Sequence, residues 1–340
     1  MRRRGVTVLV GAILLLLLTW QASVVRVPYV EMGPGPTYDT LGQANGKRVI
    51  SVTGADTTKS AGQLRMTTVE VQAELSLVDA VVGWWRDDYA VVPRELIYPP
   101  GKSEKDVEED NARDFKQSQS SAETAALRKL GYPVEVTVAG VAAGYPAENV
   151  LLEGDVITTV DGTPVTSAVK LAELVRAKPA GSPHEVGFKR EGQSRTATIS
   201  AKKGDDDNPR LGVTVENKQP HPFELKIELD RIGGPSAGLM FTLGIIDTLK
   251  PEDLTGGMVI VGTGTIDEEG NVGPIGGIPQ KLVAAKAAKA KIFLTPAANC
   301  QEAVANAQAA LPLIKVGTLD DALNALDALR AGRTPPLCSR

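Results

Sequence analysis

A serine stands at residue 236, where a glycine-rich turn leads into a helix-length apolar stretch, and residues 233–238 read GGPSAG. The glycines permit a tight backbone and Pro235 suits the start of a helix, so Ser236 is expected at a helix N-terminus. The loop that includes Gly234, Pro235 and Ala237 is the candidate for stabilising an oxyanion through exposed backbone N–H groups. The same pattern also occurs in ordinary helix caps, so alone it is weak evidence for catalysis.

A lysine occupies a similar position in a second segment, residues 274–282, which read PIGGIPQKL. Pro279 predicts a helix start, and at roughly 100° per residue Lys281 would share a face with a stripe of alanines, at positions 284, 285 and 288. Burial and the helix dipole should lower its pKa from about 10.4, and a neutral amine can act as general base for a serine hydroxyl. The alternative is a surface lysine whose ammonium group reaches solvent.

Together the two segments resemble the signature of Lon-type (S16) Ser–Lys peptidases. That family has a GPSAG-like serine motif, then a TG-x-I strand, then a P-I-GG-x-x-x-K-L helix, and the counterparts here are residues 234–238, 263–266 and 274–282. The resemblance implies that Ser236 is the nucleophile, that Lys281 is the general base and that Thr263 orients the lysine.

Two positions depart from the family pattern. Gly233 stands where many members have Asp, two residues before the proline of the serine motif, and Thr265 replaces the common Glu after the Thr-Gly pair. Neither change removes the Ser–Lys dyad, but the groove that faces the substrate is expected to differ.

Residues 134–202 indicate a separate small unit. A GDVI stretch at 154–157 is followed by the turn Asp161-Gly162 and a helix over 167–176, an order that resembles a PDZ domain of the bacterial protease type. Such domains bind an extended C-terminal peptide by strand addition and capture its carboxylate on backbone N–H groups. In the permuted bacterial layout, the resemblance places that loop near Leu130, Gly131 and Tyr132.

The N-terminus predicts a membrane anchor. Three arginines precede an apolar run that is about 20 residues long if its outer edge at 21–23 is counted, just enough to span a bilayer. A cleaved signal peptide is the alternative, but no clean A-x-A site follows the run. The positive-inside rule then places the arginines in the cytoplasm and everything after Val25 outside it.

Several classes of function are disfavoured. The net charge of −4 argues against nucleic-acid binding. His184 and His221 lie in no metal-ligand spacing, so no metal or other cofactor is expected. Residues 42–47 have the wrong spacing for a P-loop and Arg48 replaces its Ser/Thr, which disfavours ATP binding. Cys300 and Cys338 fit either a disulfide or two unrelated thiols.

A charged segment, residues 103–130, predicts one long solvated helix between Ser103 as N-cap and Gly131 beyond its C-terminus. The peptidase resemblance covers about residues 222–330 and, more weakly, 62–69, which implies a PDZ domain inserted into an α+β fold of the ribosomal S5 domain 2-like type. The expected parts are a cytoplasmic stub with transmembrane anchor (1–25), the N-terminal part of the Lon-like domain (26–131), the PDZ domain (132–204), the catalytic part (210–332) and a tail (333–340).

The predicted protein is thus an ATP-independent, membrane-anchored serine endopeptidase that resembles PDZ-containing Lon-like peptidases of Gram-positive bacteria. Its expected partners are extracytoplasmic or membrane-proximal proteins that are selected by their C-terminal tails, and a homo-oligomer is compatible with the sequence. The alternative is a membrane-tethered PDZ scaffold on a catalytically silent Lon-like fold.

Overall fold

The computed structural model describes residues 2–204, 206–229, 232–307 and 311–339. Met1 of the expected stub and Arg340 of the expected tail lie outside this description. The chain divides into two compact units, the first made of Met1–Ala126 with Phe223–Arg340 and the second of Leu127–Pro222. The second unit is therefore inserted into the sequence of the first.

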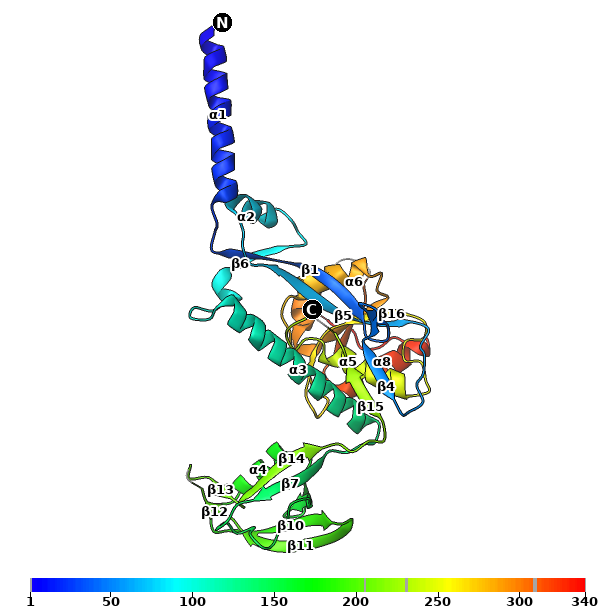
Figure 1. The fold of residues 1–340 in the computed structure, drawn as a ribbon. Coiled ribbons are helices and arrows are strands. Elements are labelled where there is room, and N and C mark those ends of the chain that lie inside the picture. The colour runs from blue at the N-terminus through cyan, green and yellow to red at the C-terminus, as the bar shows by residue number, and fades with distance from the viewer. Residues whose placement is uncertain (1, 205, 230–231, 308–310, 340) are drawn as a thin grey trace. The chain divides into compact units, whose positions relative to one another are not determined.

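A mixed sheet forms the centre of the first unit, with strand order β20-β19-β16-β5-β1-β6 (Figure 1). These strands are β1 (Tyr29–Asp39), β5 (Gln63–Gln72), β6 (Ala90–Pro93), β16 (Val259–Gly262), β19 (Ile292–Pro296) and β20 (Leu313–Val316). β16 pairs in parallel with β5 and β19, whereas β1 pairs antiparallel with β5 and β6. The inner parallel strands are buried on both faces, which explains their continuous apolar sequences.

The other elements of the first unit surround this sheet. Its helices are α1 (Arg2–Val24), α2 (Leu77–Trp84), η1 (Arg94–Leu96), α3 (Glu104–Lys129, whose last residues belong to the second unit), α5 (Gly238–Leu249), α6 (Ile278–Ala287), η2 (Ala297–Asn299), α7 (Cys300–Ala305) and α8 (Leu319–Arg330). Its short strands are β2 (Gln43–Ala44), β3 (Lys47–Arg48), β4 (Ile50–Thr53), β15 (Glu224–Ile227), β17 (Thr265–Ile266) and β18 (Val272–Gly273). Of residues 42–47, which the sequence disfavours as a P-loop, all but the first belong to the β2–β3 hairpin.

Helices α5 and α6 cover opposite faces of the central sheet (Figure 1). Val261 of β16 packs in one cluster with Ile278 and Leu282 of α6, whereas the next residue, Gly262, approaches Met240 of α5. Successive residues of a strand point to opposite faces, so the two helices are separated by the sheet. Thr263 directly follows β16, and from there its side chain contacts both the turn before α5 and the first turn of α6.

Helix α3 differs from the solvated helix that its charged sequence predicts. Its bounds match the prediction, and Ser103 caps it by accepting a hydrogen bond from the N–H of Asp106. One face is nevertheless buried, because small and aromatic residues recur there at helical spacing, at positions 115, 118, 122, 125 and 126. The ring of Phe115 packs edge-on against Phe241 of α5, with centroids 5.7 Å apart.

The N-terminal helix α1 contains a stretch, Val6–Val24, that is long and apolar enough to cross a membrane by length and composition. Its described side chains are exposed apart from the half-buried Ala22, and Leu15, Leu16 and Trp20 are each more than 60% exposed. By length and composition, this helix is one candidate membrane span of the described residues.

The second unit is an antiparallel sheet with the strand order β11-β10-β8-β7-β14 and one helix. Its elements are β7 (Glu135–Val141), β8 (Val156–Val160), β9 (Thr163–Pro164), α4 (Ala168–Arg176), β10 (Pro183–Arg190), β11 (Gln193–Ser200), β12 (Lys202–Lys203), β13 (Pro209–Arg210) and β14 (Val213–Lys218). The predicted boundary at residue 204 falls inside this unit, because β14 pairs with β7 along its whole length. Strand β14, which completes the sheet, thus comes after the charged segment around residue 204.

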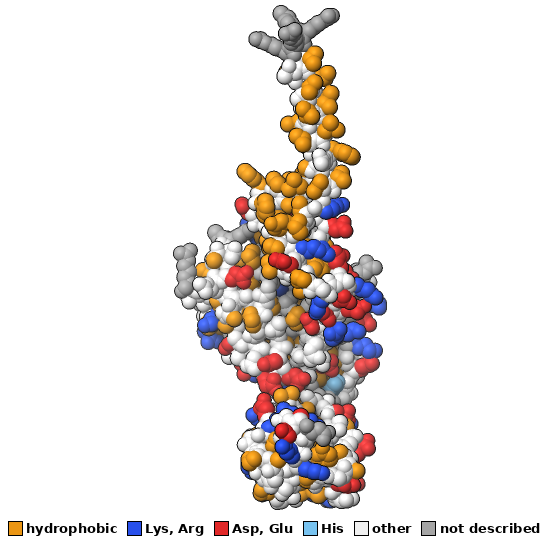
Figure 2. Space-filling model, turned by 90° about the vertical axis from the view of Figure 1, so that its left-hand side faces the viewer, with side chains coloured by type: hydrophobic (Ala, Val, Ile, Leu, Met, Phe, Trp, Pro, Cys, Tyr) orange, Lys and Arg blue, Asp and Glu red, His pale blue; other side chains and the backbone are white. Residues whose placement is uncertain are grey.

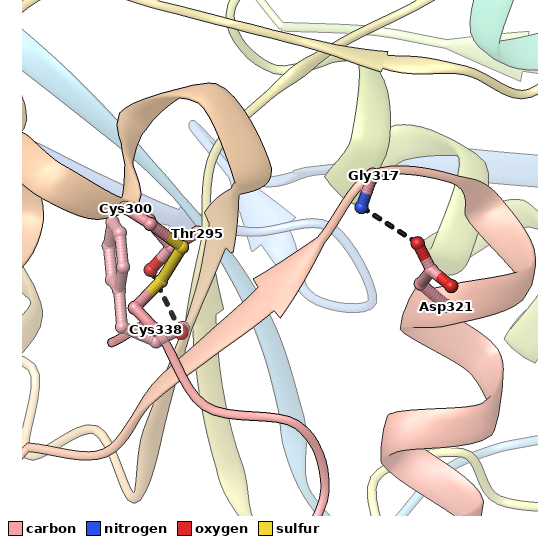
Figure 3. The surroundings of a disulfide bond; sticks show 6 residues. Thr295, Cys300, Gly317, Asp321 and Cys338 are labelled. Carbon is pink, nitrogen blue, oxygen red and sulfur yellow. Dashed lines mark hydrogen bonds between the residues drawn. A yellow bond between two sulfur atoms is a disulfide. The ribbon is translucent and has the colours of Figure 1, made fainter. Parts of the chain in front are cut away.

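A disulfide joins Cys300, the first residue of α7, to Cys338 in the C-terminal tail (Figure 3). The tail also continues the central sheet, since the N–H of Cys338 donates to the carbonyl of Leu313 in β20. In Figure 3 the neighbouring turn is held by Asp321, which accepts a hydrogen bond of 2.9 Å from the N–H of Gly317. Closing a loop across a sequence separation of 38 contributes about 3–4 kcal/mol in the chain-entropy account of disulfides.

Candidate active site

Ser236 lies in the turn that immediately precedes α5, two residues before the helix begins, and it is half-buried. Two hydrogen bonds from α3 hold this turn. The N–H of Gly234 donates to the carbonyl of Asn111 at 2.9 Å, and the hydroxyl of Ser118 donates to the carbonyl of Pro235 at 2.9 Å. The long helix therefore fixes the backbone on the N-terminal side of the serine.

Thr263 connects the serine turn to the lysine. Its hydroxyl donates to the backbone carbonyl of Ser236 at 3.1 Å, and the N–H of Gly264 donates to the same carbonyl at 2.9 Å. The ammonium of Lys281 donates to the Thr263 hydroxyl at 3.0 Å. The three residues that the sequence singles out are thus brought together, and Thr263 is completely buried between the other two.

Lys281 is in the first turn of α6, and only 3% of it is exposed. Gly277 starts this helix in the left-handed conformation, with φ of 73°, which a residue with a Cβ would adopt only with strain. Ala284 and Ala285 are buried on the same helix, whereas Lys286 is exposed, as the helical spacing predicts. Desolvation by burial lowers the pKa of Lys281 from its ordinary value near 10.5 to about 8.

Asn299 holds the loop that leads into α6. Its side-chain oxygen accepts a hydrogen bond from the N–H of Ile275, and its side-chain nitrogen donates to the carbonyl of the same residue, both at 2.9 Å. This residue directly precedes the disulfide-bonded Cys300, so the C-terminal tail, η2 and the lysine loop are mechanically connected. Sequence reasoning missed Asn299, because a side-chain amide that pairs with a backbone 24 residues away has no motif.

The contacts from α3 were also missed, although a signal for them exists. Phe115, Ser118 and Ala122 repeat at helical spacing within a charged segment, and this pattern indicates a buried stripe. Within the described residues, the hydroxyl of Ser236 donates no hydrogen bond, so it is free to turn. Catalytic hydrogen bonds are often formed only when a substrate is bound. The arrangement therefore joins the turn that bears a half-buried hydroxyl to a desolvated amine through the Thr263 hydroxyl.

A groove in the second unit lies between α4 and the segment that leads into β14. It is lined on the helix by Ala168, Leu171, Ala172 and Val175, and on the other side by residues 209–215. Gly212 has φ of 87° there, and a Cβ at this position would collide with Tyr145. Leu130, Gly131 and Tyr132 are not among the lining residues. They follow the end of α3, so the loop predicted to capture a carboxylate lies outside this groove.

Replacing the buried lysine tests its burial independently of any activity. We expect that Lys281→Met raises the free energy of unfolding by about 3 kcal/mol near neutral pH, because the folded protein no longer buries an ammonium. The folded protein releases this proton near pH 8 and the unfolded chain near pH 10.5, so the advantage of the variant should shrink as the pH rises between these values. Denaturant unfolding of the wild type and of Lys281→Met, from neutral pH to about pH 10.5, measures this difference in stability. Lys286→Met, which changes an exposed lysine of the same helix, is the control. Parallel stability curves at all pH values would contradict a depressed pKa.

Two family models match the chain. Residues 231–328 match that of the Lon protease (S16) C-terminal proteolytic domain, and residues 107–201 match that of the PDZ domain. Among solved structures, the PDZ domain of an SdrC-like protein from Listeria monocytogenes is 27% identical, with 24% of this chain and 85% of that chain covered and a TM-score of 0.23.

Curated relatives carry Lon protease names. Lon protease 2 of Bacillus subtilis (strain 168) is 28% identical over 204 residues, which are 58% of this chain and 34% of the relative. Lon protease of Koribacter versatilis (strain Ellin345) is 33% identical over 92 residues, which are 26% of this chain and 11% of the relative. The matches therefore span about a third or less of these relatives. The chain combines a proteolytic domain of the Lon (S16) family, over residues 231–328, with a PDZ domain.

Proposed function

We propose that the protein is a serine endopeptidase in which Ser236 is the nucleophile and Lys281 the general base. The observation that carries this proposal is the continuous hydrogen-bonded path from the Lys281 ammonium through the Thr263 hydroxyl to the Ser236 backbone. A structural lysine would gain nothing from burial at a helix N-terminus, where desolvation opposes its charge. A general base needs such an environment, because it must lose its proton near neutral pH.

In the proposed reaction, the neutral amine of Lys281 takes the proton of Ser236 as the hydroxyl oxygen attacks the peptide carbonyl. Collapse of the tetrahedral intermediate breaks the C–N bond, and the Lys281 ammonium returns the proton to the leaving amine. Water then attacks the acyl-enzyme with the same base, which releases the second product and restores the hydroxyl. Thr263 holds the Lys281 amine next to the serine turn during both steps, because its hydroxyl contacts the amine and the Ser236 carbonyl.

The turn before α5 supplies the proposed oxyanion site. Within the described residues, the N–H groups of Ala237 and Gly238 donate no hydrogen bond, and they lie at the positive end of the helix dipole. Gly238 cannot be larger, because a Cβ there would come within 3.0 Å of the hydroxyl oxygen of Ser118 and the backbone of Ile266. The backbone of Gly238 thus lies close against Ile266 and Ser118, with no room for a side chain.

The PDZ groove is proposed to select substrates by their C-terminal tails. A peptide could add to β14 as a further strand while its apolar side chains contact Leu171 and Val175 of α4. Leu211 and Gly212 line this groove, and their backbone N–H groups could capture the terminal carboxylate. With α1 as an uncleaved anchor, the catalytic part would lie outside the cytoplasm, where cleavage would proceed without ATP.

Covalent labelling tests the dyad. A fluorophosphonate probe, which reacts with activated serines, should modify the wild-type protein on Ser236. Ser236→Ala should abolish the modification, and Lys281→Ala should slow it by about 10²–10⁴-fold, the contribution typical of a general base. Intact-mass and peptide-mass spectrometry measure both.

The control for this experiment is Lys286→Ala, which removes an exposed lysine from the same helix and should leave the labelling rate unchanged. Cleavage of a loosely folded casein, without nucleotide, should follow the same order among the variants, and added ATP should not accelerate it. Labelling that persists in Ser236→Ala would identify a different nucleophile. A wild-type protein that neither labels nor cleaves, yet binds peptides, would favour the silent scaffold.

Tail recognition makes a second prediction. Ala172→Glu places a long charged side chain in the groove, so we expect at least about tenfold weaker binding of peptides with an apolar, free C-terminus. Fluorescence anisotropy with such a decapeptide measures this, and the amidated form of the same peptide should bind wild-type protein equally weakly. Glu173→Ala, a change at an exposed position of α4, is the matched control. Equal affinity for the free and amidated peptides would exclude carboxylate capture.

A further inference from the structure

Helix α2 packs on the first unit through its smallest residues. Ala80 and Gly83 are buried, and a Cβ on Gly83 would collide with Glu31 of β1 and Val91 of β6. The helix therefore lies directly against the edge of the central sheet, where only a hydrogen atom fits. Its register is fixed by Ser76, which forms a capping box with Asp79.

The remaining faces of α2 are apolar and exposed. The exposed side chains are Leu77 at 44%, Val81 at 50%, Val82 at 52% and Trp84 at 61%, and Trp85, which follows the helix as its C-cap, is 89% exposed. Asp79 is the one charged residue in the helix, and its carboxylate is engaged in the cap. A helix that is apolar on every side is normally buried, so this one lacks the environment that its sequence requires.

Hydrogen bonds fix α2 beside the end of the anchor helix. The N–H of Leu77 donates to the carbonyl of Val25 at 3.1 Å, and the N–H of Val27 donates to the carbonyl of Leu75 at 3.0 Å. Val25 directly follows α1, so the first residue of α2 is held at the residue just after the apolar span. At about 1.5 Å per residue, the far end of α2 is no more than roughly 12 Å away.

We infer that the exposed face of α2 lies in the headgroup region of the bilayer that α1 crosses, as a second membrane contact of the first unit. This inference rests on the proposed membrane anchor. Figure 1 shows α2 beside the foot of α1, and Figure 2 shows hydrophobic side chains that continue from the anchor onto the adjoining body.

The chemistry of the surface favours lipid over a protein partner. The chain has three tryptophans, and all of them lie here, Trp20 near the end of the anchor and Trp84 and Trp85 at the end of α2. Tryptophan is enriched at membrane–water interfaces, where its ring is apolar and its N–H reaches water. The ring of Trp84 packs edge-on against Tyr29, with centroids 5.8 Å apart. This contact orients the Trp84 ring and leaves most of it exposed.

The charges around α2 fit a location at the membrane surface. Arg26 and Glu74 pair across the junction, and both are exposed, as are Arg86, Asp87 and Asp88 beyond the helix. The five residues include two positive and three negative side chains, so attraction to anionic lipid is not the driving force. The apolar area of α2 carries the binding, as for an interfacial helix. The central sheet would then be held close to the membrane by two contacts, which restricts rotation about the anchor.

Tryptophan fluorescence of the full-length protein tests this inference. In a Trp20→Phe background, only Trp84 and Trp85 emit. The protein would be reconstituted in vesicles of phosphatidylcholine and phosphatidylglycerol, with or without brominated acyl chains. We expect blue-shifted emission and at least about a twofold loss of intensity with the brominated lipid, which quenches only on contact. Val82→Glu in the same background should reduce the quenching, because a carboxylate opposes immersion.

A second reporter separates the anchor from α2. The variant with Trp84→Phe and Trp85→Phe retains Trp20 and reports insertion of α1 alone. Quenching of Trp20 without quenching of Trp84 and Trp85 would overturn the inference for α2 and leave the anchor intact. The absence of quenching at all three positions would overturn both. Shielding of Trp84 and Trp85 that grows with protein concentration but is unaffected by bromine would identify contact with a second copy instead, and would also contradict the inference.

Discussion

The candidate site is built around one buried lysine ammonium, and the rest of the first unit must offset the free-energy cost of burying it. Lys281 is almost completely removed from solvent, and a single hydroxyl, that of Thr263, is its hydrogen-bond partner among the described residues. Placing a charge in such a site costs free energy, so the surrounding fold must hold the site together by other means. The almost wholly buried helix α5 and the cluster beneath α6 supply that stabilisation on the two sides of the sheet. A depressed pKa is the direct consequence of this balance.

The geometry explains why the three residues need not be close in sequence. Thr263 stands at the carboxyl end of β16, and the turn before α5 and the first turn of α6 meet there from opposite faces. Two supports come from further away. Helix α3 holds the serine turn through Ser118, and Asn299 holds the lysine loop beside the disulfide of the tail. The rigidity of the candidate site is thus a property of the whole unit.

Much of this fold is predictable from local sequence, because strand and helix patterns, caps and glycines act over short distances. The helix over residues 104–129 and the two motif segments are examples. What escaped prediction depends on tertiary contact. The buried face of α3 was obscured by charges on its other face, and Asn299 acts on a distant backbone. The groove lining on the segment that leads into β14 depends on such contact too, because β14 enters the sheet last in sequence, and carboxylate capture at Leu130–Tyr132 stays a prediction. The cysteine pairing was open for the same reason.

The central claim is that Lys281 serves as the base for Ser236, and the pH dependence of acylation tests it most directly. The rate at which Ser236 is acylated by an excess of a chromogenic ester would be followed by stopped flow from about pH 6 to about pH 10. The account predicts that the rate rises with the neutral fraction of Lys281, with an inflection near pH 8 that is lost in Lys281→Ala. A rate that does not change through pH 8, or an inflection that persists in the variant, would contradict it.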